Sequence, residues 1–145
     1  MFEIKVKRLT DTAELPKHGS EYAAGYDLYA DNQERVAIMP HETKMIGTGL
    51  AMCFPINYFG AIFARSGLAS KHGMRPANCV GVIDADYRGE IKVALHNDSE
   101  EVYYLDPGER IAQLVLMPFE EMYFDVVEDL EDTTRGVGGF GSTGK

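Results

Sequence analysis

The sequence has few cysteines, no long apolar run and a shortage of positive charge. Cys53 and Cys79 are the only cysteines; they have no metal-binding spacing and form no dense disulfide framework, so we interpret both as small buried side chains. No apolar run approaches the roughly 20 residues of a membrane-spanning helix, and the opening residues lack a signal-peptide core. For these 145 residues we expect one main domain without membrane contact, located in the cytoplasm, or inside a host cell if the source is viral.

The charge balance is acidic. The chain has 14 Lys and Arg against 23 Asp and Glu, a formal net charge of −9. Binding to a nucleic-acid backbone needs clustered cations, so we predict no nucleic-acid partner. Much of the excess acid lies in Glu120-Glu121 and in 128–132, which is typical of a solvated connector. An anionic ligand would therefore need a local group of cations.

Short alternating runs of apolar residues predict an all-β protein. The runs around Phe2–Val6, Val36–Ile38 and Ile91–Leu95 have the period of strands and are bounded by turn residues. Further strands are predicted at Met45–Phe54, Tyr58–Ala64, Asn78–Ile83, Val102–Leu105, Arg110–Met117 and Tyr123–Val127. Many short strands are typical of a sandwich, a barrel or a jelly roll. The one predicted helix is Ser66–His72, with Ser66 as its N-cap and Gly73 as its stop.

After Val127 the apolar pattern stops, so we divide the chain into a domain of residues 1–127 and an arm of residues 128–145. The last eleven residues contain five glycines, one arginine and one phenylalanine. A segment of this kind is either a flexible terminus or a lid that orders when its backbone N–H groups wrap an anion. Residues 139–145 imitate the start of a P-loop, but no strand precedes them and no helix follows, so we reject a P-loop.

Three segments carry residues suited to phosphate chemistry. Arg65-Ser66-Gly67 stands where a strand meets the helix, which suits either a phosphate site or an ordinary cap with a surface arginine. Asp84 follows an apolar strand at a hairpin bend. There it would either be partly buried and act as a base or be an ordinary turn residue. The same turn-residue alternative applies to Asp27. Arg110 and Gln113 begin an apolar strand and are weak evidence alone. The four histidines have no ligand spacing.

Taken in order, five segments resemble the five motifs of the homotrimeric dUTPase family (deoxyuridine 5'-triphosphate nucleotidohydrolases). They span nearly the whole chain, and the third and fifth are the most specific: Ala24–Leu28, Arg65–Ala69, Gly81–Ile91, Gly108–Leu116 and Arg135–Gly144. The resemblance implies a jelly-roll-like β-barrel of the β-clip type with one short helix. It also implies a homotrimer whose active sites combine the first four motifs of two chains with the tail of a third.

The activity implied by the resemblance is hydrolysis of dUTP to dUMP and pyrophosphate by water attack on the α-phosphorus. This dUTP diphosphatase reaction limits uracil in DNA and supplies dUMP for dTTP synthesis. Asp84 would activate the water, and Asn78 with the hairpin backbone, including Gly81, would bind the uracil edge. Tyr87 would lie under the deoxyribose and leave no space for a 2′-hydroxyl.

The resemblance also assigns the phosphate contacts. Arg65, Ser66, Gly67 and Gln113 would hold the phosphates, and Mg²⁺ would bridge the three groups, with Asp27 reaching the metal through water only. Arg110 would have a structural role. From the tail, Arg135 would pair with the γ-phosphate and Phe140 would stack on uracil. Gly141, Ser142 and Thr143 would close over the phosphates.

Other classes of protein have this fold or a similar composition. A dCTP deaminase or a bifunctional deaminase–dUTPase has the same fold, but such enzymes use a hairpin glutamate at the base ring where this chain has Asp84. A non-catalytic nucleotide-sensing protein would not need Asp84 or the tail. A jelly-roll carbohydrate or capsid module would leave the five segments unexplained.

Overall fold

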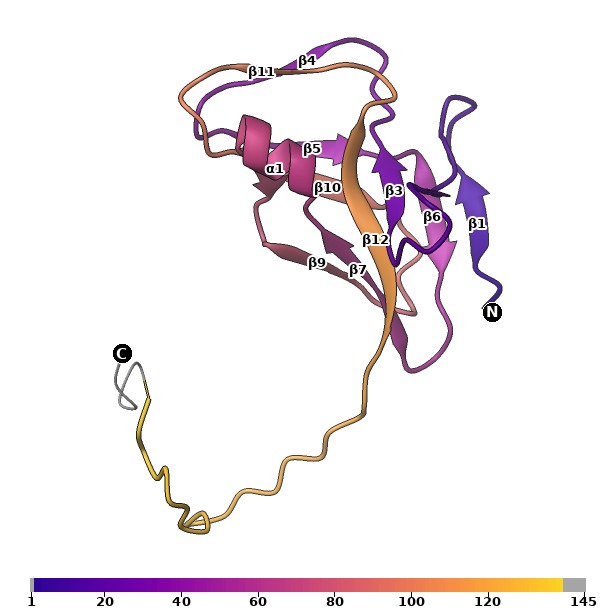
Figure 1. Cartoon of the computed structure of the whole chain (residues 1–145). Helices are drawn as coiled ribbons and strands as arrows, with labels where there is room; N and C mark the ends of the chain where they lie inside the picture. The colour runs from indigo at the N-terminus through magenta and orange to yellow at the C-terminus, as the bar shows by residue number, and fades with distance from the viewer. Residues whose placement is uncertain (1, 140–145) are drawn as a thin grey trace.

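The computed structural model describes residues 2–139 and consists of short strands, loops and one helix (Figure 1). The elements in chain order are β1 Lys5–Arg8, β2 Lys17–His18, β3 Tyr26–Tyr29, β4 Val36–Ile38, β5 Thr43–Gly47, β6 Leu50–Cys53, β7 Tyr58–Phe63, α1 Ser66–His72, β8 Met74–Pro76, β9 Val80–Ile83, β10 Lys92–Asn97, β11 Tyr103–Leu105 and β12 Arg110–Pro118. The all-β, jelly-roll-like fold with one short helix is confirmed.

The strands of residues 2–139 form four hydrogen-bonded sheets, with no single closed ring of strands among them. The largest has the order β2-β3-β12-β7-β9 and is antiparallel throughout, with the long strand β12 at its centre. A second sheet has the order β5-β10-β8, and β1-β6 and β11-β4 form separate pairs. Since β9 and β10 belong to different sheets, the segment that joins them passes from one sheet to the other.

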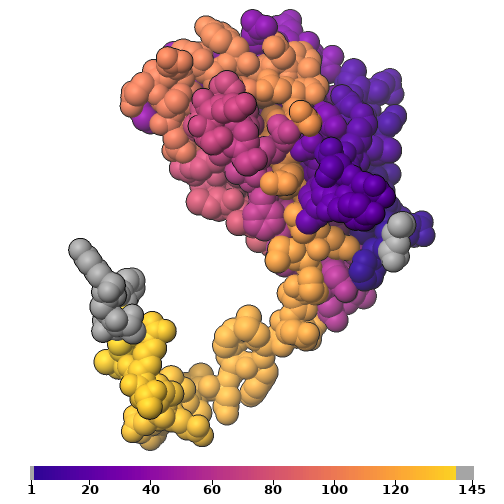
Figure 2. Space-filling view, viewed as in Figure 1, coloured from indigo at the N-terminus to yellow at the C-terminus, as the bar shows by residue number. Residues whose placement is uncertain are grey.

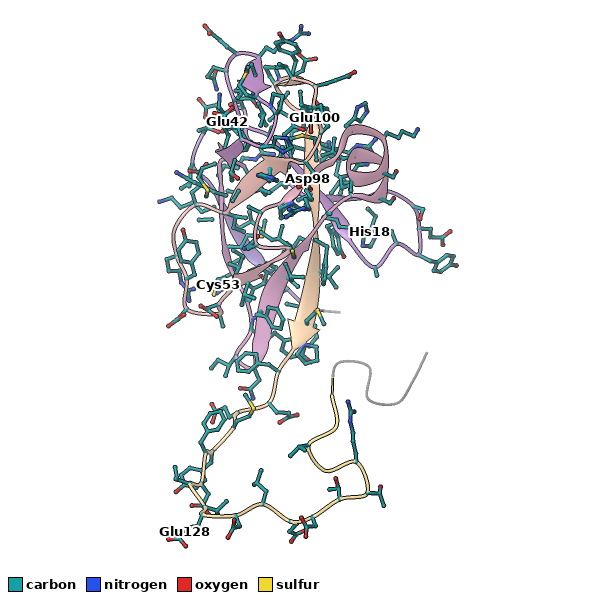
Figure 3. The ribbon with its side chains drawn as sticks, turned by 90° about the vertical axis from the view of Figure 1, so that its left-hand side faces the viewer. His18, Glu42, Cys53, Asp98, Glu100 and Glu128 are labelled. Atoms are coloured by element: carbon teal, nitrogen blue, oxygen red, sulfur yellow. The ribbon has the colours of Figure 1, made fainter. Side chains whose placement is uncertain are left out.

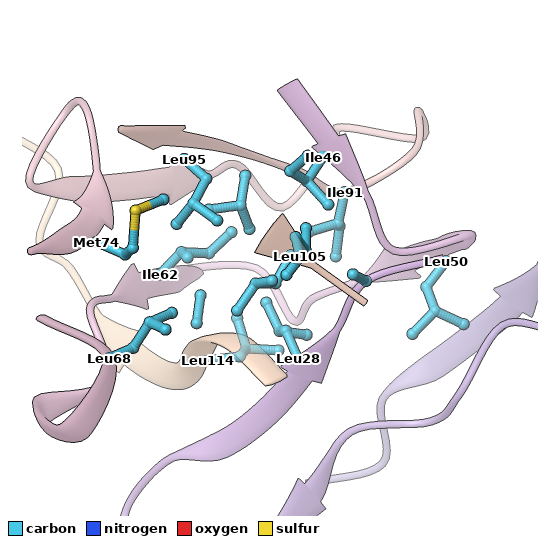
Figure 4. Packing of buried hydrophobic residues seen from close by; sticks show 14 of the residues in the cluster. Leu28, Ile46, Leu50, Ile62, Leu68, Met74, Ile91, Leu95, Leu105 and Leu114 are labelled. Atoms are coloured by element: carbon cyan, nitrogen blue, oxygen red, sulfur yellow. The ribbon is translucent and has the colours of Figure 1, made fainter. Parts of the chain in front are cut away.

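One apolar core lies between these sheets (Figure 4). Every sheet and the helix contribute buried side chains: Ala13, Leu28, Ala30, Ile38, Ile46, Leu50, Met52, Phe54, Ile62, Leu68, Met74, Ile91, Val93, Leu95, Leu105, Ile111, Ala112 and Leu114. Alternation places these residues on the inward face of each strand, as in β10, where Val93, Leu95 and Asn97 are buried. The core therefore fixes the positions of the loops that leave β3, β7, β9 and β12.

The helix has the predicted bounds but a different cap. Arg65 continues the extended backbone of β7 and is the N-cap, with φ −85° and ψ 129°, so Ser66 is the first helical residue. No side chain caps this end. Gly73 ends the helix in the left-handed conformation, with φ 65°, and its N–H donates to the Ala69 carbonyl. Glycine suits that position because it has no β-carbon.

Residues 119–139 form an arm without helix or strand that leaves the body after β12 (Figures 1 and 2). The predicted strand Tyr123–Val127 is wrong for this chain, because the segment has no neighbouring strand to pair with. Tyr123 and Val126 are 91% and 96% exposed. In Figure 3 the side chains of the arm, Glu128 among them, lie well away from the sheets.

Two further differences concern local structure. The predicted strand Met45–Phe54 is two strands, β5 and β6, because Gly49 turns the chain with φ 65°. The short strands β2, β3 and β8 were not predicted, since two to four residues give too little alternation to detect. No helix within residues 2–139 is long and apolar enough to cross a membrane.

Candidate active site

Four polar side chains meet at one end of the five-stranded sheet, and we call them the Asp27 cluster: Asp27, Arg65, Arg110 and Gln113. Arg65 Nε donates to Asp27 Oδ1 at 2.8 Å, and Arg110 Nη1 donates to Asp27 Oδ2 at 3.1 Å. The side chain of Asp27 is only 13% exposed and that of Arg65 24%, so little water screens this contact. Asp27 thus fixes two cations at the edge of the sheet.

The strand register explains why these residues meet. In the sheet, Asp27 of β3 lies opposite Gln113 of β12, and Gln113 lies opposite Phe63 of β7. Arg65 follows Phe63 by two residues, at the same end of the sheet. Sequence analysis left Asp27 open as a turn residue, but it lies within a strand.

Gln113 is held in place from two sides. Its Nε2 donates to the Ala64 carbonyl at 2.8 Å, immediately before Arg65. A β-carbon at Gly25 would lie 2.6 Å from Gln113 Oε1, so only glycine leaves space for this amide. Sequence analysis missed this role of Gly25, although the residue stands in the first of the five motif-like segments.

Ser66 and Gly67 lie beside this cluster at the start of α1. Both residues are exposed. A β-carbon at Gly67 would meet no atom within 4 Å, so the surface above it is open to a ligand. Together with Arg65, they form an exposed cationic edge that suits phosphate binding.

The β-hairpin predicted around Asp84 is wrong, because β9 pairs with β7 and β10 pairs with β5 and β8. The second group of predicted residues lies on the segment that joins β9 to β10, residues 84–89, whose sharp bend we still call the Asp84 hairpin. It is a tight turn in which the Tyr87 N–H donates to the Asp84 carbonyl at 3.2 Å. Arg88 Nη1 donates to the carbonyls of Ala85 and Tyr87 at 2.7 and 2.9 Å. These contacts of Arg88 were not predicted. They stiffen the turn that presents Asp84.

Asp84 is exposed in the single chain, so its expected partial burial is absent here. Within residues 2–139, no Lys or Arg side chain pairs with its carboxylate. An exposed, unpaired carboxylate can hold a water molecule and accept its proton.

Asn78 and Gly81 lie at the other end of β9. Asn78 is exposed, just after β8. Gly81 is buried, and a β-carbon there would lie 3.1 Å from Ile62 Cβ, so glycine permits close contact with β7. Cys79, predicted to be buried, is exposed with a φ of 62°, and Cys53 is half-buried.

The Asp27 cluster and Asp84 lie at opposite ends of the β7–β9 pairing. Ile83, next to Asp84, pairs with Gly60, whereas Val80 pairs with Phe63 near Arg65. Each strand residue advances about 3.3 Å, so the two ends of this pairing are about 10 Å apart. A single chain therefore places its candidate base and its candidate phosphate ligands apart.

The side chains of the candidate site suit a metal ion that is coordinated mainly by the bound substrate and not by the protein. Among residues 2–139 no three His, Cys, Asp or Glu side chains form a metal-binding group. Both oxygens of Asp27 accept from arginines, so this carboxylate suits a water-mediated contact. Mg²⁺ commonly binds through substrate phosphates and retained waters.

Arg135 lies on the arm, where its Nε donates to the Gly138 carbonyl at 2.8 Å. The predicted contacts of Phe140, Gly141, Ser142 and Thr143 fall outside the described residues.

Comparisons with known proteins identify the family. The dUTPase family model matches residues 11–144. The deoxyuridine 5'-triphosphate nucleotidohydrolase of Nautilia profundicola is 49% identical over 143 residues, 99% of each chain. The Staphylococcus bacteriophage 80alpha dUTPase, solved with dUPNHPP, has a TM-score of 0.85 and 30% identity and covers 100% of both chains.

A variant of the dUTPase of phage phi11 of S. aureus has a TM-score of 0.81 and 25% identity, covering 90% of this chain and 100% of that chain. Its structure describes the coordination of a structural Mg(II) ion. The match of the family model to nearly the whole length agrees with the fold and with the motif-like segments, and the chain belongs to the dUTPase family.

Proposed function

We propose that this protein hydrolyses dUTP to dUMP and pyrophosphate by attack of water on the α-phosphorus. The observation that carries the proposal is an unpaired carboxylate on a stiff hairpin together with two arginines and a glutamine on the same sheet, in a member of the dUTPase family. The reaction limits uracil in DNA and supplies dUMP for dTTP synthesis. Because its substrate is a free nucleotide, we place the activity inside the cell.

In this mechanism Asp84 holds the attacking water and accepts its proton. The oxygen of that water bonds to the α-phosphorus, and the electron pair of the broken P–O bond leaves with pyrophosphate. Asn78 and the backbone around Gly81 bind the uracil edge, and Tyr87 lies against the deoxyribose. A base with the wrong donors and acceptors leaves buried polar groups unpaired, which can lower the rate by about 10⁴-fold.

The Asp27 cluster receives the phosphates. Arg65, Ser66, Gly67 and Gln113 contact the triphosphate, and Arg110 holds Asp27 in place. Mg²⁺ bound with the substrate supplies positive charge to the three phosphates, and Asp27 would contact it through water. The cluster brings two arginines together in a chain whose net charge is −9.

We further propose a homotrimer in which each site takes its Asp84 hairpin and its Asp27 cluster from different chains. The separation of these groups within one chain supports this arrangement. The exposed apolar side chains of the arm, such as Met122, Phe124 and Leu130, also favour a partner surface. Residues 128–145 would then close a site, with Arg135 on the γ-phosphate, Phe140 on uracil, and Gly141, Ser142 and Thr143 over the phosphates.

The first test is pyrophosphate release from dUTP with and without Mg²⁺, in parallel with dCTP, dTTP and UTP and with ammonia detection. We expect selective release from dUTP that Mg²⁺ stimulates. Ammonia from dCTP would instead favour a deaminase. A folded protein that releases nothing from any of the four would favour nucleotide sensing.

Mixing two inactive variants tests the shared site. Asp84→Asn disables the hairpin and Arg65→Ala disables the cluster, so homotrimers of either variant should be inactive. If the two groups come from different chains, unfolding and refolding the variants together in equal amounts should restore activity in roughly a quarter of the sites. No recovery from mixed trimers, verified by mass, would contradict the shared site.

A further inference from the structure

The Tyr87 ring lies directly against the backbone of Gly89. A β-carbon at Gly89 would lie 2.5 Å from Cζ and 3.0 Å from Cε2 of the ring, and it would also clash with the Tyr87 hydroxyl. Real β-carbons essentially never approach another heavy atom at the shorter of these distances. Gly89 does not have a positive φ, so the contact with the ring, and not backbone strain, requires glycine here.

The hydroxyl of Tyr87 is held by the backbone of Glu90. Tyr87 Oη donates to the Glu90 carbonyl at 3.0 Å. The Glu90 carboxylate in turn accepts from the Gly49 N–H at 3.0 Å, and it packs against Gly47, where a β-carbon would lie 3.1 Å from Glu90 Cδ. The acceptor of the tyrosine hydrogen bond is therefore tied to the turn between β5 and β6.

That turn is joined to the buried frame of the protein. Thr48 is 1% exposed, and its hydroxyl donates to the Ile91 carbonyl at 2.8 Å. The Ile91 N–H donates to the Leu50 carbonyl at 2.8 Å. Tyr87, although 43% exposed as a residue, thus rests on a series of contacts that ends in the core.

From this geometry we infer that Gly89 is a specificity-determining residue: it sets the position of the Tyr87 ring and thereby the preference for deoxyribose over ribose. The inference rests on the proposed function, in which Tyr87 lies against the sugar. Gly89 covers one side of the ring, so the ligand takes the exposed side. A methyl group at position 89 makes the ring turn aside, and space opens for a 2′-hydroxyl.

The test compares kcat/KM for dUTP and for UTP in the wild type and in Gly89→Ala. We expect the dUTP-to-UTP ratio to fall about tenfold or more, since close-fit contacts of this size discriminate by about 10–200-fold. The matched control is Gly19→Ala, whose β-carbon would have only Asp27 Oδ2 within 4 Å, at 3.8 Å, an ordinary contact. Any effect through Asp27 would act on the phosphates, which dUTP and UTP share. The ratio of this control should equal that of the wild type.

A double variant shows whether Gly89 acts through Tyr87. Gly89→Ala/Tyr87→Ala should have the same ratio as Tyr87→Ala alone, because the ring that Gly89 positions is gone. Should Gly89→Ala be unfolded, restored folding of the double variant would support the contact, and failure to restore it would contradict it.

The remaining outcomes separate this inference from the proposed function. An unchanged ratio in a folded Gly89→Ala, or equal losses on both substrates, would overturn the role of Gly89 and leave dUTP hydrolysis standing. A wild type that releases no pyrophosphate from dUTP would overturn the proposed function itself.

Discussion

The Asp27 cluster and the Asp84 hairpin hold their functional side chains by different means. In the cluster, one carboxylate that is 13% exposed fixes two guanidinium groups, and the strand register brings in Gln113. In the hairpin, backbone hydrogen bonds and the contact of Tyr87 with Gly89 set the shape, and no cation pairs with Asp84 within residues 2–139.

The difference follows from the chemistry proposed for each region. Arginines that bind a flexible triphosphate need fixed positions. A carboxylate such as Asp27 can hold them there through charge-assisted hydrogen bonds. A carboxylate that takes a proton needs its oxygens free, so steric and backbone contacts position it instead. In the proposed mechanism each region supplies a group that the other lacks.

The largest expected effect comes from removing the free carboxylate of the hairpin. Asp84→Asn should lower kcat by about 10²–10⁴-fold, the usual contribution of a general base, while leaving the affinity for a non-hydrolysable dUTP analogue largely unchanged. Steady-state kinetics and calorimetric titration measure the two quantities. A near wild-type kcat would show that Asp84 is not the base.

Removing residues 135–145 tests the arm, which belongs to neither region. Under the proposed mechanism, a folded trimer with at least about a 100-fold lower kcat/KM is expected, since these residues would fix the triphosphate for attack. Light scattering and kinetics on the truncated chain test this. Dissociation into single chains would identify the tail as a structural strap instead.

In the cluster, Asp27→Asn should affect binding and stability together. The amide cannot accept from both arginines, so Arg65 loses its fixed position. We expect KM to rise about tenfold and the free energy of unfolding to fall by roughly 1.5–3 kcal/mol, typical of hydrogen bonds to charged groups. Denaturant unfolding and kinetics give both values, and a change in kcat alone would contradict a positioning role.

On the hairpin, Tyr87→Ala should mainly change specificity. Without the ring, the sugar pocket accepts a 2′-hydroxyl, so kcat/KM for UTP should rise by about tenfold or more. Stability should change little, because the side chain is 43% exposed. Unchanged discrimination between dUTP and UTP would show that the sugar is recognised elsewhere.

Local patterns were enough to predict the helix bounds and the bend at residues 84–89, because the signals lie within a few residues. The pairing of the two flanking strands in a hairpin was wrongly predicted, since β9 pairs with β7 and β10 pairs with β5 and β8. The Asp27 cluster could not be derived from local patterns, since Asp27 and Arg65 are 38 positions apart and only the strand register joins them. The contacts of Gly25 and Gly89 depend on side-chain positions, which no local pattern contains. The predicted strand in the arm failed for a different reason: alternation marks a strand-forming segment, but a strand also needs a partner.

The smallest effect should come from an ion pair outside both regions. Arg75 Nε donates to Asp98 Oδ2 at 2.5 Å and Nη2 to Oδ1 at 3.0 Å, and this hydrogen bonding holds the pKa of Asp98 below its ordinary value of 3.8. A lowered carboxyl pKa stabilises the fold above the ordinary value, and the effect is lost as pH falls through the folded-state pKa. Asp98→Asn, which leaves the Arg75 Nη1 contacts with the Pro76 and Ala77 carbonyls in place, should therefore be slightly less stable at neutral pH. The difference should vanish in strong acid, whereas kcat/KM should not change. Thermal unfolding from pH 7 to pH 2 tests this prediction. A loss of stability as large as that of Asp27→Asn would show that the two ion pairs, of Asp27 and of Asp98, do not differ in strength because of their burial.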